Sequence, residues 1–215
     1  MGLHLRDHAL LEDPQPFARL LEQPGVVEES TIAGPVGFMA FHGGRLEEVT
    51  DVVARGAAAL SGSSYYGVLQ PDDEQWHIPS HRVTAEQSDT LAEFLDHVEV
   101  VIAIHGFGRV DLWRSLLVGG RNRELAEHVA CRLIPALPHY EILTDLDDIP
   151  KPLRGQHPNN PANVPRGGGV QIELPPRVRG RSPIFWGMDV QHPVPHTTSL
   201  IRALARSADE WVTGG

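Results

Sequence analysis

Hydrophobic positions in the chain alternate between short continuous runs and longer segments with helical spacing. Residues 36–41, 98–104 and 169–175 are mostly apolar over six or seven positions, as buried strands are. Further segments place apolar residues at every third or fourth position, which predicts amphipathic helices. These segments are residues 15–23, 45–62, 91–98, 121–137 and 197–211. Shorter stretches at 64–70 and 141–145 predict two more strands. Strands and helices alternate, so we predict one α/β domain over residues 1–215, with a mixed, mostly parallel sheet and flanking helices.

The predicted helices over 45–62 and 121–137 have recognisable ends and faces. In the first, Glu47 lies in the opening turn, where the helix dipole favours a carboxylate. In the second, Ile134 lies on the apolar face and Cys131 is expected to be a buried, inert thiol. Both helices should therefore pack against the sheet.

Glycine and proline are frequent in this sequence, with 21 Gly and 18 Pro among 215 residues. Such a composition favours short elements and many loops. Pro, Asn and Gly concentrate between positions 150 and 166, where no helical or strand period is visible. An irregular segment of this length predicts a functional loop or a lid.

Charge is unevenly distributed along the chain. The formal net charge is −10, which argues against nucleic acid or an anionic membrane as a general partner. Residues 1–100 hold 17 acidic and 5 basic side chains, whereas residues 149–188 hold six basic side chains and a single acidic one, Glu173. The basic stretch is either a solvated loop or a patch for an anionic ligand.

The single cysteine and the first residues of the chain bear on its compartment. One cysteine cannot form an internal disulfide, and charges interrupt residues 1–14, where a signal peptide would be apolar. No apolar run is long enough to span a membrane. We therefore expect a cytoplasmic protein, and the pattern leaves its oligomeric state open.

Titratable side chains occur at the ends of the three predicted buried strands. His42 follows the first strand, His105 follows the second, and Glu173 lies near the end of the third. Ligands gather at the carboxyl edge of an open parallel sheet, and Glu47 could reach back to that edge from the next helix. Two histidines and one carboxylate with an open fourth position are typical of catalytic zinc, with Glu173 as a second carboxylate beside them. Each histidine could instead be a loop residue bonded to backbone, but a carboxylate inside an apolar strand needs a partner.

Six motifs in this order and spacing resemble the poly-gamma-glutamate hydrolase family of phages and bacteria. They are HGGRLE (42–47), WHIPSH (76–81), IAIHGFG (102–108), LVGGRNREL (117–125), NPANVPR (160–166) and GVQIEL (169–174). The resemblance covers roughly residues 36–175. It implies a zinc-carboxypeptidase-like α/β fold and hydrolysis of the γ-linked amide bonds of polyglutamate.

The resemblance also implies roles for individual residues. His42, Glu47 and His105 match the zinc ligands, Glu173 matches the general base, and Arg121 is a candidate for binding the oxyanion or a substrate carboxylate. Further candidates for substrate binding are Arg109, Arg166, His77 and Asn163. Three positions depart from the family pattern, namely Arg45, Pro79 and Arg82. Arg45 stands between two proposed ligands, where it could narrow or recharge the site.

Two other functions remain compatible with the sequence. One is a related zinc hydrolase that acts on a small N-acyl amino acid. The other is a non-catalytic protein that binds an anion through the basic stretch at 149–188, without metal. Bound zinc at one equivalent would separate the enzymes from the binding protein.

Overall fold

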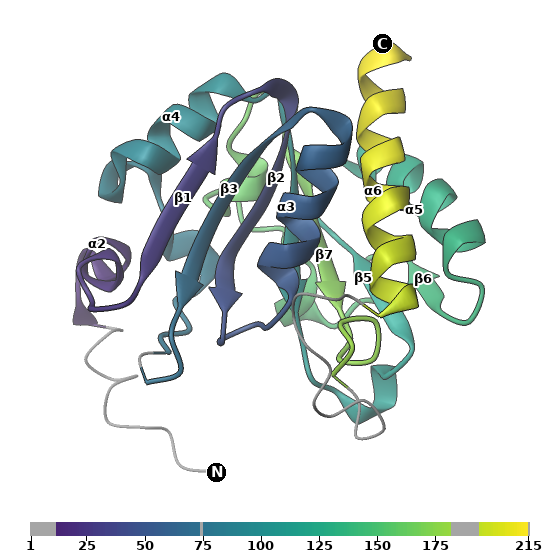
Figure 1. Cartoon of the computed structure of the whole chain (residues 1–215), viewed down its shortest axis with the longest axis horizontal. Coiled ribbons are helices and arrows are strands. Elements are labelled where there is room, and N and C mark those ends of the chain that lie inside the picture. The colour runs from purple at the N-terminus through teal and green to yellow at the C-terminus, as the bar shows by residue number, and fades with distance from the viewer. Residues whose placement is uncertain (1–11, 74, 182–193, 215) are drawn as a thin grey trace.

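A seven-stranded mixed sheet with helices on both faces forms the core of the molecule (Figure 1). The structure is a computed structural model that describes residues 12–73, 75–181 and 194–214. The strands are β1 (Val27–Thr31), β2 (Gly34–Gly44), β3 (Ser63–Gln70), β4 (Val100–Gly106), β5 (Ser115–Val118), β6 (Glu141–Leu143) and β7 (Gly169–Leu174). The main helices are α2 (Pro16–Leu21), α3 (Thr50–Ser61), α4 (Asp89–His97), α5 (Arg123–Ala136) and α6 (Pro195–Thr213). The predicted single α/β domain is confirmed.

The strand order is β1-β3-β2-β4-β7-β5-β6, and the centre of the sheet is parallel. β3, β2, β4 and β7 run in one direction, so their carboxyl ends meet at the lower edge in Figure 1. β1 is antiparallel to β3, and β5 is antiparallel to β7. The mixed, mostly parallel sheet was therefore predicted correctly, and its parallel centre brings the ends of β2, β4 and β7 together.

Each face of the sheet has its own hydrophobic core. On one face, α3, α5 and α6 cover alternate strand residues such as Phe38, Ile102 and Ile172. On the other face, α2 and α4 pack against Met39, Ala103 and their neighbours. Side chains alternate between faces along a strand, so His105 shares the second face with Ala103.

The sequence did not predict β1 and β5. β1 has the sequence VEEST, and no residue of it is fully buried. Charges on such a strand protect an exposed sheet edge, but they also remove the apolar signal. β5 is only four residues long, and a run that short carries no measurable period.

α3 and α5 differ in detail from the helices predicted over residues 45–62 and 121–137. α3 begins at Thr50, so Glu47 precedes the helix and does not lie in its first turn. On α5, Cys131 is exposed and Ile134 is 57% exposed, which corrects both expectations. The buried stripe of α5 includes two alanines that contribute little hydrophobic signal, namely Ala126 and Ala130.

The irregular segment over 150–166 is packed against the sheet. It contains two 3₁₀ turns, η4 (Lys151–Leu153) and η5 (Pro161–Asn163). Asn160 and Ala162 are almost fully buried, and Ala162 belongs to the core beneath α2 and α4. The part around Asn160 and Ala162 is therefore packed into the core, whereas residues 151–159 are exposed or half-buried, and the expectation of a functional loop or lid stays a prediction for them.

No helix within the described residues is long and apolar enough to cross a membrane. The absence of a signal peptide was inferred from residues 1–14, most of which lie outside the described residues.

Candidate functional site: a carboxylate among three histidines

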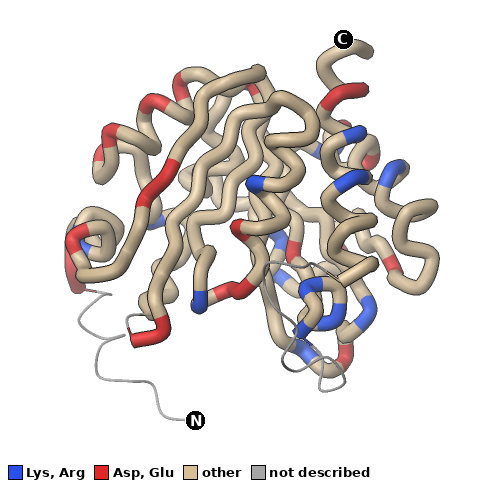
Figure 2. Tube along the Cα trace, in the orientation of Figure 1, with Lys and Arg blue, Asp and Glu red and all other residues tan. Residues whose placement is uncertain are grey.

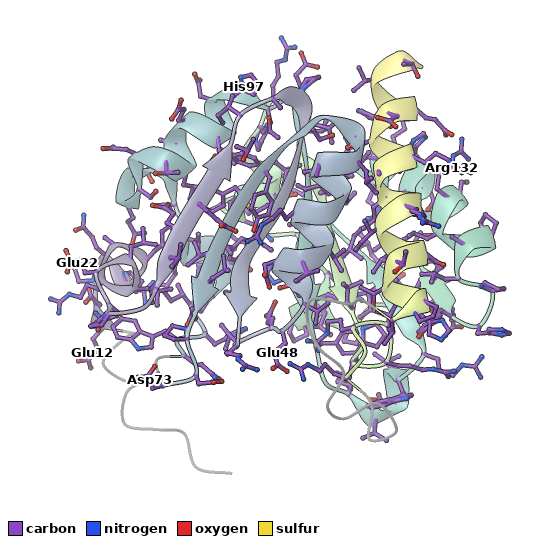
Figure 3. The ribbon with its side chains drawn as sticks, viewed as in Figure 1. Glu12, Glu22, Glu48, Asp73, His97 and Arg132 are labelled. Carbon is purple, nitrogen blue, oxygen red and sulfur yellow. The ribbon has the colours of Figure 1, made fainter. Side chains whose placement is uncertain are left out.

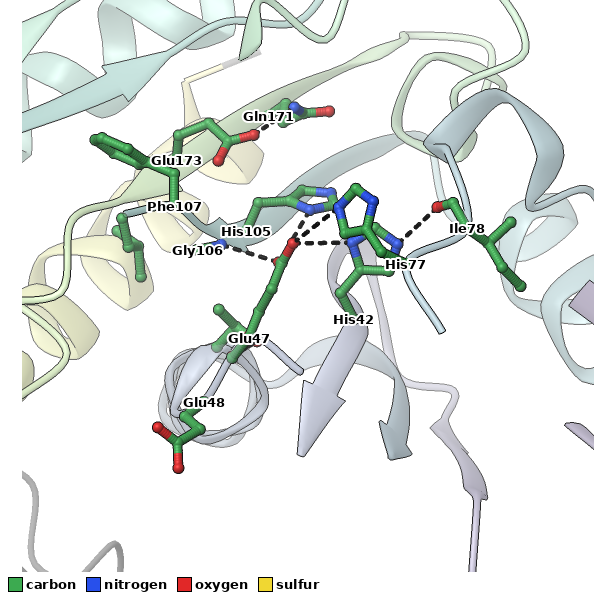
Figure 4. A network of polar contacts seen from close by, with 12 residues as sticks. His42, Glu47, Glu48, His77, Ile78, His105, Gly106, Phe107, Gln171 and Glu173 are labelled. Atoms are coloured by element: carbon green, nitrogen blue, oxygen red, sulfur yellow. Dashed lines mark hydrogen bonds and ion pairs between the residues drawn. The ribbon is translucent and has the colours of Figure 1, made fainter. Parts of the chain in front are cut away.

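Glu47 lies at the centre of a buried polar cluster at the carboxyl edge of the sheet (Figure 4). Its Oε1 lies 3.0 Å from Nδ1 of His42 and 3.7 Å from Nε2 of His77. Its Oε2 lies 3.2 Å from Nδ1 of His105 and accepts a hydrogen bond of 2.9 Å from the backbone N–H of Gly106. One carboxylate thus contacts three imidazoles from three parts of the chain.

A tight connection between β2 and α3 places Glu47 in this position. The backbone N–H of Glu47 donates to the carbonyl of His42, and the hydroxyl of Thr50 donates to the carbonyl of Glu47. Gly44 has a φ of 70° and lies so close to the backbone of Gln70 that a Cβ atom would collide with it. The register between β2 and β3 also shifts between Ala40 and Gly43. Such an irregularity re-aims a side chain, here that of His42, and is common beside functional sites.

The hydrogen bond between His42 and the main chain determines which ring nitrogen carries the proton. Nε2 lies 2.9 Å from the carbonyl oxygen of Ile78, which can only accept, so Nε2 carries the proton. In a neutral ring, Nδ1 then has a lone pair directed at Glu47, and two acceptors 3.0 Å apart repel unless a proton or a metal ion lies between them. A carbonyl bound to the outer nitrogen is also the usual support of a metal-bound histidine.

His105 contributes a second buried imidazole. The residue is 3% exposed, and its Nε2 atom has no hydrogen-bond partner among the described residues. Burial alone would lower the pKa of His105, but the carboxylate of Glu47 outweighs it and raises the pKa. Burial would raise the pKa of the Glu47 carboxyl group, but the neighbouring His42 and His105 outweigh burial and lower it.

The donor set fits a divalent metal ion. One ligand atom each from His42, Glu47 and His77 lies within 4.8 Å of the others. His105 is outside this group, although it contacts the same carboxylate. Imidazole nitrogens and a carboxylate oxygen are ligands that zinc accepts, and three of them leave a coordination position open. His77, which the sequence placed among substrate contacts, is 65% exposed and borders the cluster from outside.

Glu173 lies on β7 beside this cluster. It is 4% exposed, and burial raises its pKa to about 7, although His105 acts to lower it. A carboxyl group with such a pKa can accept and return a proton near neutral pH.

Two buried amides orient Glu173. The side-chain amide of Asn160 donates to Oε1 of Gln171 at 2.7 Å, so Gln171 must present its Nε2 group to Glu173. That group donates to Oε1 of Glu173 at 2.7 Å. Within the described residues no hydrogen bond engages Oε2 of Glu173, which leaves that oxygen available. The sequence analysis missed both amides; Gln171 was detectable as a polar residue on the same strand face as Glu173.

The structure does not bring the other predicted substrate contacts to this cluster. Arg109 lies in the loop after β4 and pairs with Asp111. The backbone N–H of Arg121 donates to Asn163, and both lie near Gly169, at the opposite end of β7 from Glu173.

Arg166 also lies away from the Glu47 cluster. It pairs with Glu99, directly before β4, at the amino edge of the sheet. The basic residues of 149–188 therefore do not form one continuous patch with Arg166, although several of them gather near the carboxyl end of β7 (Figure 2).

Three solved structures with a similar fold match most of this chain. A bacteriophage poly-gamma-glutamate hydrolase matches with a TM-score of 0.76 and 19% identity, over 92% of this chain and 95% of that chain. YNDL, solved in a zinc-free form, matches with a TM-score of 0.72 and 23% identity, over 88% and 93%. An N-acetylmuramoyl-L-alanine amidase from Clostridium difficile 630 matches with a TM-score of 0.51 and 10% identity, over 85% and 98%. At these identities the matches establish the fold alone.

The family is established by sequence. The family model for poly-gamma-glutamate hydrolase matches residues 18–201, and no curated protein matches the chain. The fold and the match together define the class of the protein, a hydrolase with a single α/β domain. The chain belongs to the poly-gamma-glutamate hydrolase family.

Proposed function

We propose that the protein is a zinc-dependent hydrolase that cleaves the γ-glutamyl amide bonds of poly-γ-glutamate. The observation that carries this proposal is the convergence of His42 and His105 on the carboxylate of Glu47, with Glu173 beside them on β7. Family membership supports the substrate class, and the grouping of His42 and Glu47 with His77 supports a metal ion at this cluster.

His42, Glu47 and His105 would hold the zinc ion, with His77 at the outer side of the cluster. When bound, zinc would act as a Lewis acid that polarises a carbonyl group and lowers the pKa of a water molecule to about 7. The Ile78 carbonyl fixes the ring of His42, and the N–H of Gly106 fixes the carboxylate of Glu47. These bonds hold the ligands in place before the ion arrives.

Glu173 would act as the general base and then as the general acid. Its Oε1 is occupied by the amide of Gln171, so Oε2 is the atom that accepts the proton of the attacking water. Its raised pKa lets the same oxygen return that proton to the leaving nitrogen. Asn160, through Gln171, holds the carboxylate in one orientation during both transfers.

A polymer with a carboxylate on every repeat requires cationic partners near the site. Arg109 is the candidate in the loop after β4, close to the end that carries His105. Arg121, Asn163 and Arg166 stay predictions as substrate contacts, and only a substrate that extends over several repeats could reach them from Glu173. The net charge of −10 opposes attraction from a distance, so binding would depend on short-range arginine pairing.

The test is to incubate zinc-loaded protein with poly-γ-glutamate and to follow the polymer length by gel electrophoresis. We expect shortening of the polymer, which chelator removes and zinc restores. Hydrolysis of N-acyl amino acids without shortening would assign the site to a small-molecule hydrolase. Absence of zinc binding and of both reactions would leave a non-catalytic anion-binding protein.

A further inference from the structure

Arg179 is a partly buried arginine whose side chain is bound to three backbone carbonyls. Its Nε donates to the carbonyl of Leu174 at 3.2 Å and its Nη1 donates to that of Glu48 at 2.9 Å. Its Nη2 donates to the carbonyl of Phe107 at 3.2 Å. Three of the five N–H groups of the guanidinium are thus used on the protein's own backbone.

The three carbonyls belong to the three segments that form the site. Leu174 follows Glu173 directly, Glu48 follows Glu47 directly, and Phe107 lies two residues after His105. These segments are the end of β7, the connection between β2 and α3, and the residues directly after β4. β4 and β7 are already paired in the sheet, whereas the connection that carries Glu47 and Glu48 is not a strand of it. The side chain of Arg179 bridges all three at once.

Gly106 shows how closely the guanidinium approaches the site. A Cβ atom at Gly106 would lie 2.8 Å from Cζ of Arg179, so a side chain there would require the guanidinium to move. The backbone N–H of the same glycine donates to Oε2 of Glu47. Arg179 therefore packs directly against the backbone that orients the Glu47 carboxylate.

Arg179 itself is fixed by the C-terminal helix. Its neighbour Val178 is fully buried, and the carbonyl of Val178 accepts a hydrogen bond of 2.6 Å from the hydroxyl of Thr197, in the first turn of α6. Gly180 takes a φ of 73°, which turns the chain directly after Arg179. The position of α6 thus determines where the guanidinium is presented.

We propose that Arg179 is a positioning residue that holds the segments carrying Glu47, His105 and Glu173 in one arrangement, and that α6 serves the site by anchoring it. The inference rests on the proposed zinc site. A planar guanidinium can donate in three directions at fixed angles, whereas a lysine ammonium is a point charge on a flexible stem. The chemistry of the position is therefore specific to arginine.

The experiment measures zinc affinity by chelator competition for the purified wild-type protein, Arg179→Lys and Arg179→Met. We expect the dissociation constant for zinc to rise about 10- to 100-fold in both variants, because supports of metal ligands have effects of that size. Arg179→Lys keeps the positive charge, so wild-type affinity in the Lys variant would overturn the proposal in favour of a purely electrostatic role. The Lys variant also covers the case in which Arg179→Met fails to fold.

The matched control is Arg123→Met. Arg123 donates to the carbonyls of Val118, Gly120 and Thr144, so it makes the same kind of three-way contact next to a different part of the sheet. We expect Arg123→Met to lower the melting temperature as Arg179→Met does, while zinc affinity stays within about twofold, since it touches no segment of the zinc site. Equal loss of zinc affinity in both variants would reduce Arg179 to a general stabiliser.

Imidazole NMR signals of the zinc-free proteins separate this inference from the proposed function. We expect the signals of His105 and His42 to shift or broaden in Arg179→Lys and to remain unchanged in Arg123→Met. A wild-type protein that binds no zinc would contradict the proposed function, while the imidazole signals would still decide the role of Arg179. Unchanged signals of His105 and His42 in Arg179→Lys would overturn the positioning role of Arg179.

Discussion

His105 and Glu173 are directly paired in the register of the parallel strands β4 and β7. Their side chains therefore project from the same face of the sheet, at the edge where β2 also ends. The strand register thus places His105 and Glu173 side by side at the edge of the sheet. This pairing has measurable consequences for metal binding, proton transfer and stability.

Loss of His42 or His105 should abolish stoichiometric zinc. Each contributes a buried imidazole nitrogen to the same carboxylate, and three protein ligands leave no redundancy. Elemental analysis of His42→Ala and His105→Ala should find well below one zinc per chain. His97→Ala is the comparison, because His97 is exposed and its ring contacts the carbonyl of Ala33, away from the cluster, and we expect this variant to retain the ion. Full zinc content in both His42→Ala and His105→Ala would show that the ligands are misassigned.

The Gln171 amide should affect turnover more than zinc content. Gln171→Leu removes the donor to Oε1 of Glu173 and leaves the buried amide of Asn160 without its acceptor. We expect kcat to fall about 10- to 100-fold at full zinc occupancy, since the base loses its fixed orientation. Gln87→Leu is the control, because the amide of Gln87 likewise accepts one hydrogen bond and donates another, but to the backbone of Phe17 and Arg82, beside α2. Equal kcat losses in the two variants would remove Gln171 from the mechanism.

Much of this arrangement was predictable, because period and length are strong signals in buried strands. β2, β4 and β7 were identified from continuous apolar runs, and their ends pointed to His42, His105 and Glu173. What could not be predicted depends on contacts between distant segments. The ring orientation of His42 requires a carbonyl 36 residues away, and the bridge made by Arg179 to Glu48 spans 131 residues. No local pattern contains such information.

The helices show the same division between local and distant causes. An ion pair between Arg132 of α5 and Glu210 of α6 connects the two helices, and Figure 3 labels Arg132 beside α6. The large apolar residues Leu125, Val129 and Leu133 form the buried face of α5 as their spacing predicts, together with Ala126 and Ala130. Ile134 lies beside this face and is exposed, because α5 has no neighbour on that side among its described contacts with β7, β6 and α6.

Arg109 and Arg166 should differ in their effect on substrate binding. Arg109 follows the carboxyl end of β4, whereas Arg166 pairs with Glu99 before the amino end of the same strand. We expect Arg109→Ala to raise KM for poly-γ-glutamate several-fold more than Arg166→Ala does, with kcat unchanged. Raising the salt concentration through about 0.1 M should reduce this difference, because charges are then screened within about 10 Å. Steady-state kinetics at two ionic strengths would show it, and a larger KM effect for Arg166→Ala would place substrate binding at the amino edge.

Glu173 should make the zinc-free protein less stable as pH rises. Its pKa is raised from 4.5 to about 7 in the folded state, mainly by burial, so the folded state holds the proton more tightly than the unfolded state. The unfolding free energy should therefore decline between pH 4.5 and pH 7 by about 3 kcal/mol at most, and then level off.

Glu173→Gln removes this dependence, because glutamine has no charge to bury. Denaturant unfolding of zinc-free protein at pH 5 and pH 7.5 should show the variant gaining stability relative to wild type as pH rises. Glu93→Gln, which alters an exposed carboxylate on α4, is the matched control. A constant difference between wild type and Glu173→Gln across this range would contradict the protonated, buried state of Glu173.

The most direct measurement of the central claim is a zinc titration of the metal-stripped protein, with hydrolysis of poly-γ-glutamate as the readout. The account predicts that activity rises linearly and stops at one equivalent of zinc, and that Glu173→Gln binds the same equivalent. The turnover rate of the zinc-loaded variant should fall by about a hundredfold or more, since general-base catalysis contributes on the order of 10² to 10⁴. Cleavage by the metal-free protein, or near-normal turnover by the zinc-loaded Glu173→Gln variant, would contradict it.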